Sequence, residues 1–246
     1  MKSKQLIIVL ASVFLSFSGG FLIANSFNRG DIDGLKKEND RLTQLAAESE
    51  AKTSRFTLSE DDIRAKIAEA DANPTNIKFS KELGIGLYRY AALEKNVGLL
   101  SESIKLLERV SSTDPKDYDS LVMLGNAHFD KANFGTDKSG FKAAREVYLK
   151  ASVLKPKDSN VLTDVALTYS LSEPPEYDKA ILEFRKAIEL DGKNQRALQF
   201  MIQALWANGQ SAEAAKALEQ LKSVDAANPA IPELTNVLAT QPPAKQ

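Results

Sequence analysis

A single interval recurs along the middle of this 246-residue chain. Pro74, Pro115 and Pro156 lie 41 residues apart, and a pair of apolar or small residues follows nine residues after each proline, at Leu83-Gly84, Leu124-Gly125 and Val165-Ala166. A fourth unit continues with Met201-Ile202. Self-similarity at such a period is typical of solenoids, in which each unit buries its apolar face against its neighbours. The interval therefore predicts a repeat architecture.

Each unit is predicted to contain two helices. A turn such as Asp114-Pro115-Lys116-Asp117 precedes the first helix, because proline fixes φ and cannot continue the previous helix. The second helix is clearest at residues 177–190, whose apolar side chains recur with a period of about 3.6 residues. We expect an all-α fold, an α-α superhelix of about four helix pairs, with capping helices at 59–72 and 232–240 that cover the ends of the stack.

Small and aromatic residues at fixed places in each unit resemble the tetratricopeptide repeat (TPR) family. The pattern is a Leu-Gly pair, an aromatic residue, two small residues flanking a further aromatic one, and a closing proline. The second unit matches with Leu124, Gly125, His128, Ala144, Tyr148, Ala151 and Pro156, and the third with Val165, Ala166, Tyr169, Ala180, Phe184 and Ala187. The resemblance covers residues 73–229 and implies a TPR-like solenoid, in which the small residues allow helices to approach closely.

The first two units are longer than the family norm by seven residues between their helices, near residues 94–98 and 132–140. Seven residues make two helical turns, so both helices of a unit could be one turn longer. The alternative is a protruding loop that opens at Asn133-Phe134-Gly135.

The N-terminus is apolar. Residues 6–24 carry no charge and would reach about 28 Å as a helix, close to the thickness of a bilayer's hydrocarbon core. We expect a single transmembrane signal anchor there, after a short cytoplasmic stretch at 1–5. A cleaved signal peptide is the alternative, but Leu22 fits poorly at the minus-three position of a site before Asn25.

The expected topology rests on the short basic stretch before the apolar segment and on the long domain that follows it. Lys2 and Lys4 favour a cytoplasmic N-terminus, whereas the basic residues of 29–41 leave the charge count undecided. We expect a bacterial inner-membrane protein with its repeats in the periplasm, or a secreted periplasmic form if the segment is cleaved. Ser12, Ser16 and Gly20 form a small-xxx-small face that would support a homodimer. Residues 25–58 are predicted to be a polar linker, helical or a weak coiled coil, residues 59–240 the TPR domain, and residues 241–246 a disordered tail.

Composition argues against several classes of function. The 32 basic and 33 acidic residues nearly balance, so we expect no nucleic-acid partner. The chain has no cysteine and one histidine, His128, which stands in an aromatic packing slot. We therefore expect no metal site, no cofactor and no catalytic constellation, and predict that the protein is not an enzyme.

The family resemblance implies which residues face a concave groove lined by the first helices. They are Lys78, Lys81, Tyr88 and Arg89 in unit one, Val122, Asn126, Phe129 and Asp130 in unit two, Asn160, Thr163, Leu167 and Ser170 in unit three, and Arg196, Gln199, Gln203 and Trp206 in unit four.

Two features of these positions suggest how a partner binds. Tyr88, Phe129 and Trp206 share one slot, which suits hot-spot contacts with a peptide, although core packing is the alternative. The basic residues of unit one could receive an acidic segment or remain a solvated face. Chaperone-adaptor members of the family hold a terminal carboxylate with a clamp of Lys and Asn residues. In this sequence only Lys81 and Asn126 match that clamp.

These features predict a membrane-anchored periplasmic TPR scaffold or adaptor that binds a protein or peptide partner on its concave face. The resemblance extends to anchored TPR proteins of envelope assembly, including those that present apocytochrome c for haem attachment, so a role in cytochrome c or envelope complex assembly is expected. Two alternatives are a secretion-associated periplasmic chaperone or quality-control subunit, and a structural protein that self-associates.

Overall fold

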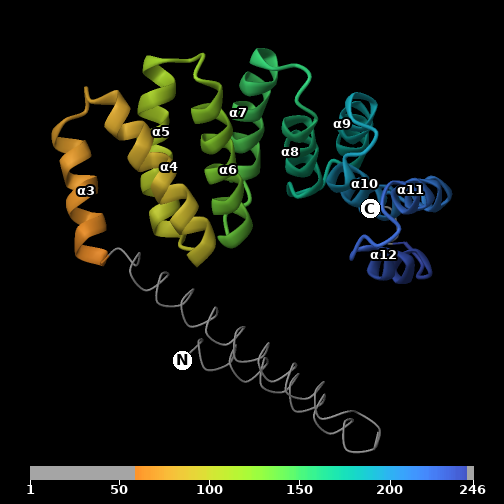
Figure 1. Cartoon of the computed structure of the whole chain (residues 1–246). Helices are drawn as coiled ribbons and strands as arrows, with labels where there is room; N and C mark the ends of the chain where they lie inside the picture. Colours follow the sequence, from red (N-terminus) through yellow and green to blue (C-terminus); the bar gives the residue numbers. More distant parts are fainter. Residues whose placement is uncertain (1–58, 243–246) are drawn as a thin grey trace, which may run out of the picture. The chain divides into compact units, whose positions relative to one another are not determined.

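The structure is a computed structural model that describes residues 59–242, and regular structure in this range is entirely helical (Figure 1). The helices follow one another in chain order from α3 to α12. Their bounds are α3 (Glu60–Ala72), α4 (Ile77–Glu94), α5 (Val97–Thr113), α6 (Tyr118–Phe134), α7 (Gly140–Leu154), α8 (Ser159–Ser170), α9 (Tyr177–Leu190), α10 (Gln195–Ala207), α11 (Ser211–Val224) and α12 (Ile231–Leu238). The all-α prediction is thus confirmed for the described residues.

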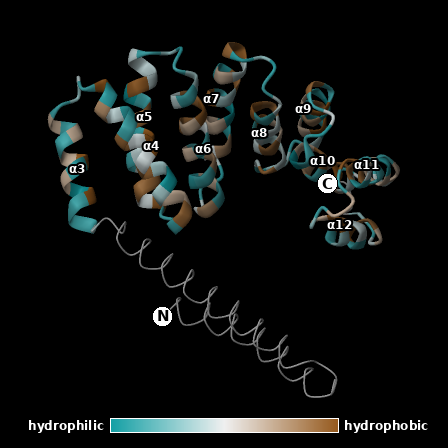
Figure 2. Cartoon of the chain, in the orientation of Figure 1, coloured by the Kyte–Doolittle hydropathy of each residue, from teal (hydrophilic) through white to brown (hydrophobic). Residues whose placement is uncertain are grey.

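The helices form four successive pairs, α4/α5, α6/α7, α8/α9 and α10/α11, each packed against the next. Helices α3 and α12 stand at the two ends of this series, near the predicted capping segments (Figure 1). Hydrophilic and hydrophobic residues both occur along the helices (Figure 2), and the buried apolar ones form three neighbouring clusters instead of one central core. This is the nearest-neighbour packing of a solenoid, as predicted.

The repeated interval corresponds to the caps of the first helices. Asn76, Asp117 and Asp158 each accept a hydrogen bond from a backbone N–H of the first turn of α4, α6 and α8, and Asn194 does the same for α10. Such caps satisfy amide groups that the helix itself leaves unpaired. Before α4, α6 and α8 a proline stops the previous helix and the Asp or Asn two residues later starts the next, whereas Gly192 takes the place of the proline before α10.

The extra residues of the first two units lengthen their helices. Helices α4 and α5 have 18 and 17 residues, and α6 and α7 have 17 and 15, whereas α8 and α9 have 12 and 14. Unit one therefore adopts the longer-helix alternative. In unit two α6 is longer, but α7 exceeds α9 by only one residue, and residues 135–139 connect α6 to α7. Only two residues, Lys95 and Asn96, connect α4 to α5, and Lys95 has a left-handed φ of 51°.

Small residues lie where helices approach most closely. A Cβ atom added to Gly125 would come within 2.5 Å of Cε1 of Tyr148, and one added to Gly84 within 3.0 Å of Cγ of Leu107. Ala144 and Ala151 are fully buried. The predicted role of the small residues in close packing is confirmed.

The N-terminal predictions lie outside the described residues. These are the anchor at 6–24 with its small-residue face, and the linker at 25–58. Between residues 59 and 242, no helix combines the length and apolar character that crossing a bilayer requires.

Candidate functional site

Polar side chains join each repeat to the next at the beginning of the first helices. Lys81 Nζ lies 2.5 Å from Oδ2 of Asp117, the cap of α6, and the Tyr118 hydroxyl donates to Oδ2 of Asp158, the cap of α8, at 2.6 Å. Partial burial by itself would raise the pKa of Asp117. The Lys81 ammonium and the Ser120 donors outweigh this effect, so the pKa of Asp117 is lowered. The caps therefore have a second role, because they also hold neighbouring repeats together.

The same arrangement recurs in the third and fourth units. Asn194, the cap of α10, donates to the hydroxyl of Thr163 at 3.2 Å, and Gln199 donates to Oδ1 of Asn228 at 2.8 Å. Three residues that the family resemblance places in the groove thus bond to the following repeat: Lys81, Thr163 and Gln199. Thr163 is fully buried, so it has no surface to offer a partner. Val122, in the slot equivalent to Lys81, is half-buried against the apolar cluster of the second unit.

A polar cavity of about 200 Å³ lies further along the first helices. We call this the polar cavity, and its lining residues come from five helices: Tyr88, Asn126, Phe129, Asp130, Tyr148, Asp164 and Arg196. Five of these seven residues belong to the predicted groove. The structure therefore brings together residues of units one, two and four that are more than 100 positions apart in the sequence.

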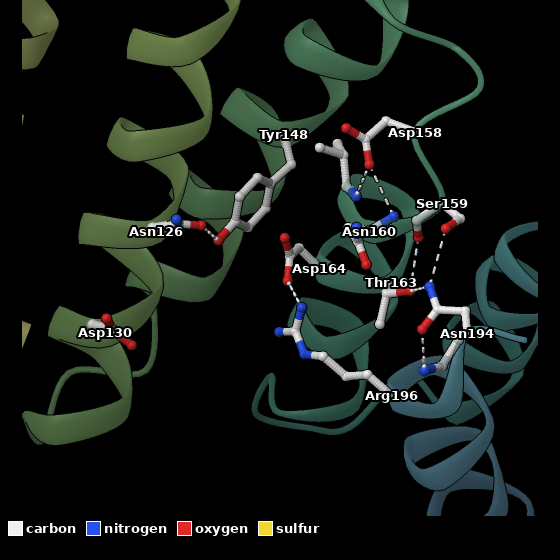
Figure 3. A network of polar contacts seen from close by, with 12 residues as sticks. Asn126, Asp130, Tyr148, Asp158, Ser159, Asn160, Thr163, Asp164, Asn194 and Arg196 are labelled. Carbon is white, nitrogen blue, oxygen red and sulfur yellow. Dashed lines mark hydrogen bonds and ion pairs between the residues drawn. The ribbon is translucent and has the colours of Figure 1, made fainter. Parts of the chain in front are cut away.

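Hydrogen bonds and one ion pair order the side chains of the polar cavity (Figure 3). The Tyr148 hydroxyl donates to Oδ1 of Asn126 at 2.7 Å, and the Tyr88 hydroxyl donates to Oδ2 of Asp130 at 3.1 Å. Nη1 of Arg196 lies 2.7 Å from Oδ1 of Asp164. The site is therefore preorganised by its own residues.

Burial changes the ionisation of the acidic groups in this cavity. It raises the pKa of both the Asp130 and the Asp164 carboxyl above the ordinary range, and the positive charge of Arg196 only partly opposes this. Burial together with the Asp130 charge also raises the pKa of the Tyr88 hydroxyl, which stays protonated and acts as a donor. The two carboxylates are consequently held in an environment that disfavours their charge.

Tyr148 and Asp164 are absent from the predicted groove. Tyr148 matches a packing position of the repeat, and only its hydroxyl reaches the cavity while its ring is buried. Asp164 carries a signal in the sequence: it is the only charged residue in the otherwise uncharged segment 159–172. An acid in a buried helix usually has a partner, and here the partner is Arg196, 32 residues later.

A second hollow, the apolar groove, shares α8 and α10 with the polar cavity and has a volume of about 350 Å³. Its lining is formed by Leu167, Ser170, Leu171, Tyr177, Phe200, Gln203, Ala204, Trp206, Ala207, Glu233 and Val237. Trp206 is partly buried, and its indole N–H lies 3.5 Å from the carbonyl oxygen of Thr240. The predicted residues Gln203 and Trp206 therefore line a hollow whose walls come mainly from α8, α10 and α12.

The three aromatic residues of the shared slot have different surroundings. Tyr88 belongs to the polar cavity and Trp206 to the apolar groove. Phe129 lines the polar cavity and also packs edge-on against Phe141, with ring centroids 5.2 Å apart. The three residues thus lie in two different hollows, with Phe129 also packed into the core, instead of forming one uniform aromatic row.

The basic residues of unit one are placed less uniformly than the sequence suggests. Lys78 and Arg89 are exposed, and Nζ of Lys78 lies 3.9 Å from Oε1 of Glu82. Lys81 is bonded to Asp117 as described above. Asn160 is exposed near the start of α8.

The described residues contain no group of His, Asp and Glu side chains arranged to hold a metal ion. His128 is partly buried in α6, where burial lowers its pKa, and its Nε2 lies 3.8 Å from Oε1 of Glu108. The predicted packing slot for His128 agrees with this position.

Comparisons with known proteins identify the repeat. Residues 176–239 match the model of a tetratricopeptide repeat family. A search of curated proteins found no match.

Solved structures extend the similarity over most of the chain. A crystal structure of MamA superposes with a TM-score of 0.54 at 24% identity, covering 67% of this chain and 87% of the other. A MamA fragment from Desulfovibrio magneticus RS-1 gives 0.56 at 16% identity, covering 76% and 96%. A thermophilic TPR protein of Thermus thermophilus gives 0.54 at 16% identity, covering 81% and 97%. At these identities the structures show the fold alone: the described helices have the fold of a TPR-type solenoid, and residues 176–239 match a tetratricopeptide repeat model.

Proposed function

We propose that this protein is a non-catalytic scaffold or adaptor that binds a segment of a protein partner along the first helices of its repeats. The observation that carries the proposal is the adjacency of the polar cavity and the apolar groove, which share α8 and α10. Asp164 and Leu167, one turn apart on α8, belong to the two different hollows. A segment lying across successive repeats would contact both.

The proposal places the protein in the bacterial inner membrane, anchored through residues 6–24, with its repeats in the periplasm. Support comes from the length and lack of charge of that segment. The repeat pattern of the sequence resembles anchored TPR proteins of envelope assembly, and by that analogy the proposed role is in building envelope or cytochrome c complexes. A chaperone subunit or a self-associating scaffold would use the same face, and the identity of the captured polypeptide distinguishes them.

Substitution of Trp206 tests the proposal. We expect Trp206→Ala to weaken partner capture by about 1–3 kcal/mol while leaving helicity intact, because an aromatic side chain lining a hollow is a typical hot spot. The measurement is quantitative mass spectrometry of polypeptides that copurify with the detergent-solubilised full chain, supported by circular dichroism.

The matched control is Leu182→Ala, which removes a 53% exposed apolar side chain from the second helix of unit three. Capture should be unchanged in this variant. Equal capture by Trp206→Ala and the unmodified chain would reject the apolar groove as the binding surface. Copurification of the chain with itself alone would favour the self-associating scaffold.

A further inference from the structure

The polar cavity has an unbalanced charge. Its lining includes two carboxylates, Asp130 and Asp164, and one guanidinium, that of Arg196. Arg196 is paired with Asp164 at 2.7 Å. Within residues 59–242, the hydrogen bond that Asp130 receives comes from the neutral Tyr88 hydroxyl, and Asp130 forms no ion pair. Arg196 attracts Asp130 only at longer range, so a partly buried carboxylate is left without a cation in contact with it on the face where the proposed partner lies.

We propose that the polar cavity receives a cationic side chain, lysine or arginine, from the bound partner segment, and that this side chain pairs with Asp130. The inference rests on the proposed function and names the chemistry of the partner. A cation entering here would meet the Asp130 carboxylate, the oxygen of Tyr88 and Oδ1 of Asn126, all of which can accept hydrogen bonds.

The size and the walls of the cavity fit a single side chain. Its volume of about 200 Å³ lies below the roughly 300–1,000 Å³ typical of pockets for whole small molecules. Tyr88 and Phe129 contribute aromatic side chains to its walls, which can pack against the methylene stem of lysine or the plane of arginine, and Tyr148 contributes its hydroxyl. An anionic group would meet two carboxylates and an arginine that is already paired, so the charge of the lining disfavours it.

The position of the apolar groove also predicts how far apart a basic and an apolar side chain of the partner segment lie. Asp164 lines the polar cavity, and Leu167 and Ser170 on the same helix line the apolar groove. Three to six residues of α-helix correspond to about 4.5–9 Å, which an extended chain covers in roughly one to three residues. We therefore expect the partner segment to carry an apolar side chain about one to three residues away from its lysine or arginine.

Peptide selection on the full 246-residue chain in detergent micelles tests the inference. The probe is a displayed library of random twelve-residue peptides, selected against the unmodified chain, Asp130→Asn, and the control Glu189→Gln. Glu189→Gln removes the same charge from an exposed position on α9. We expect enrichment of lysine or arginine beside an apolar residue on the unmodified chain and on Glu189→Gln, and loss of that enrichment on Asp130→Asn.

A double-mutant cycle with one selected peptide completes the test. Replacing its basic residue by norleucine should weaken binding to the unmodified chain by about 30-fold or more, and should have little effect on Asp130→Asn. Equal losses on both chains would overturn the pairing with Asp130. Selected peptides without a basic residue would overturn the inference and leave the proposed function standing, whereas no selected peptide at all would overturn both. Matching thermal unfolding of Asp130→Asn and the unmodified chain, or greater stability of the variant, shows that a binding loss does not come from misfolding.

Discussion

At the scale of the residue, Asp130 and Asp164 lie where their charge is unfavourable for folding. Each carboxyl has a higher pKa in the folded chain than its ordinary value of 3.8, so the folded chain binds these protons more tightly than the unfolded chain does. By linkage, the contribution of these groups to stability rises as the pH falls through the raised pKa and is complete below the unfolded value. The opposite holds for Asp117, whose lowered pKa means that its contribution is lost in acid.

The first prediction follows from the raised pKa of Asp130. Asp130→Asn keeps an acceptor for the Tyr88 hydroxyl and removes the charge, so we expect the free energy of unfolding at pH 7 to rise by up to about 1 kcal/mol, reduced by the partial exposure of the group. The gain should shrink as the pH falls through the raised pKa of Asp130, because the carboxyl of the unmodified chain then becomes protonated, and it should be smallest below the ordinary value of 3.8. Urea unfolding monitored by circular dichroism at several pH values measures this gain. The charges that interact with Asp130 are those of Arg196 and Asp164. A loss of stability at pH 7 would mean that Asp130 holds the fold together.

The second prediction concerns the contact between Gly125 and Tyr148. An added methyl group would lie 2.5 Å from the Tyr148 ring, so Gly125→Ala should lower the free energy of unfolding by about 1–3 kcal/mol and displace the Tyr148 hydroxyl from Asn126. Gly86→Ala is the matched control in a helix, because nothing lies within 4 Å of its added Cβ. That control should be neutral or stabilising by up to about 1 kcal/mol. Similar urea midpoints for the two variants would contradict the proposed close packing.

At the scale of the element, the caps decide where the first helices begin and how the repeats join. Asp158 accepts from the backbone N–H groups of Asn160 and Val161 and also from the Tyr118 hydroxyl of the preceding unit. Asn96 caps α5 through the N–H of Leu99, within one unit. Asp158 therefore accepts one backbone hydrogen bond more than Asn96 and, in addition, a hydrogen bond from the preceding repeat.

The third prediction uses this difference. Asp158→Ala should cost about 2–3 kcal/mol of unfolding free energy, because it removes a cap and leaves the Tyr118 hydroxyl without its acceptor. Asn96→Ala should cost about 1 kcal/mol, the usual value of a cap alone. Urea unfolding of both variants gives the comparison, and equal costs would show that the bond between repeats adds nothing to stability.

The helices and their pairing could be predicted from the sequence because they depend on local signals. The proline turns, the 3.6-residue period and the small residues at Gly125 and Ala144 all act within one unit or between adjacent helices. The candidate site was harder to predict from the sequence, because it depends on how far each first helix is displaced from the next. Thr163 was expected in the groove and lies in the core, and Asp164, its neighbour in sequence, lines the cavity instead. A one-residue difference on a helix turns a side chain by about 100°, which sequence periodicity does not resolve at that precision.

At the scale of the whole molecule, stability is distributed along the series of repeats. The buried clusters are neighbours, so a local change should be felt chiefly in its own repeat and the adjacent one. Helix α12 covers the end of this series with Leu234, which is 1% exposed.

The fourth prediction follows from that position. Leu234→Ala should destabilise the terminal repeat by about 2–5 kcal/mol, and hydrogen exchange should accelerate in α10–α12. Protection in α4–α7 should stay unchanged, because α12 packs against α10 and α11. Hydrogen-exchange mass spectrometry of the full chain makes the comparison. Uniform loss of protection from α4 to α12 would show that the described repeats unfold as one cooperative unit.

The bonds between repeats have a mechanical consequence. Lys81–Asp117, Tyr118–Asp158, Asn194–Thr163 and Gln199–Asn228 all join neighbouring units near the N-terminal ends of the first helices. A rotation between two units that kept these bonds would turn about that end, and its largest displacement would fall at the opposite end. Trp206 lies towards the C-terminal end of α10, so the width of the apolar groove would change in such a rotation. The Tyr88–Asp130 hydrogen bond joins units one and two towards the C-terminal end of α6 as well, so it holds the polar cavity at a fixed width.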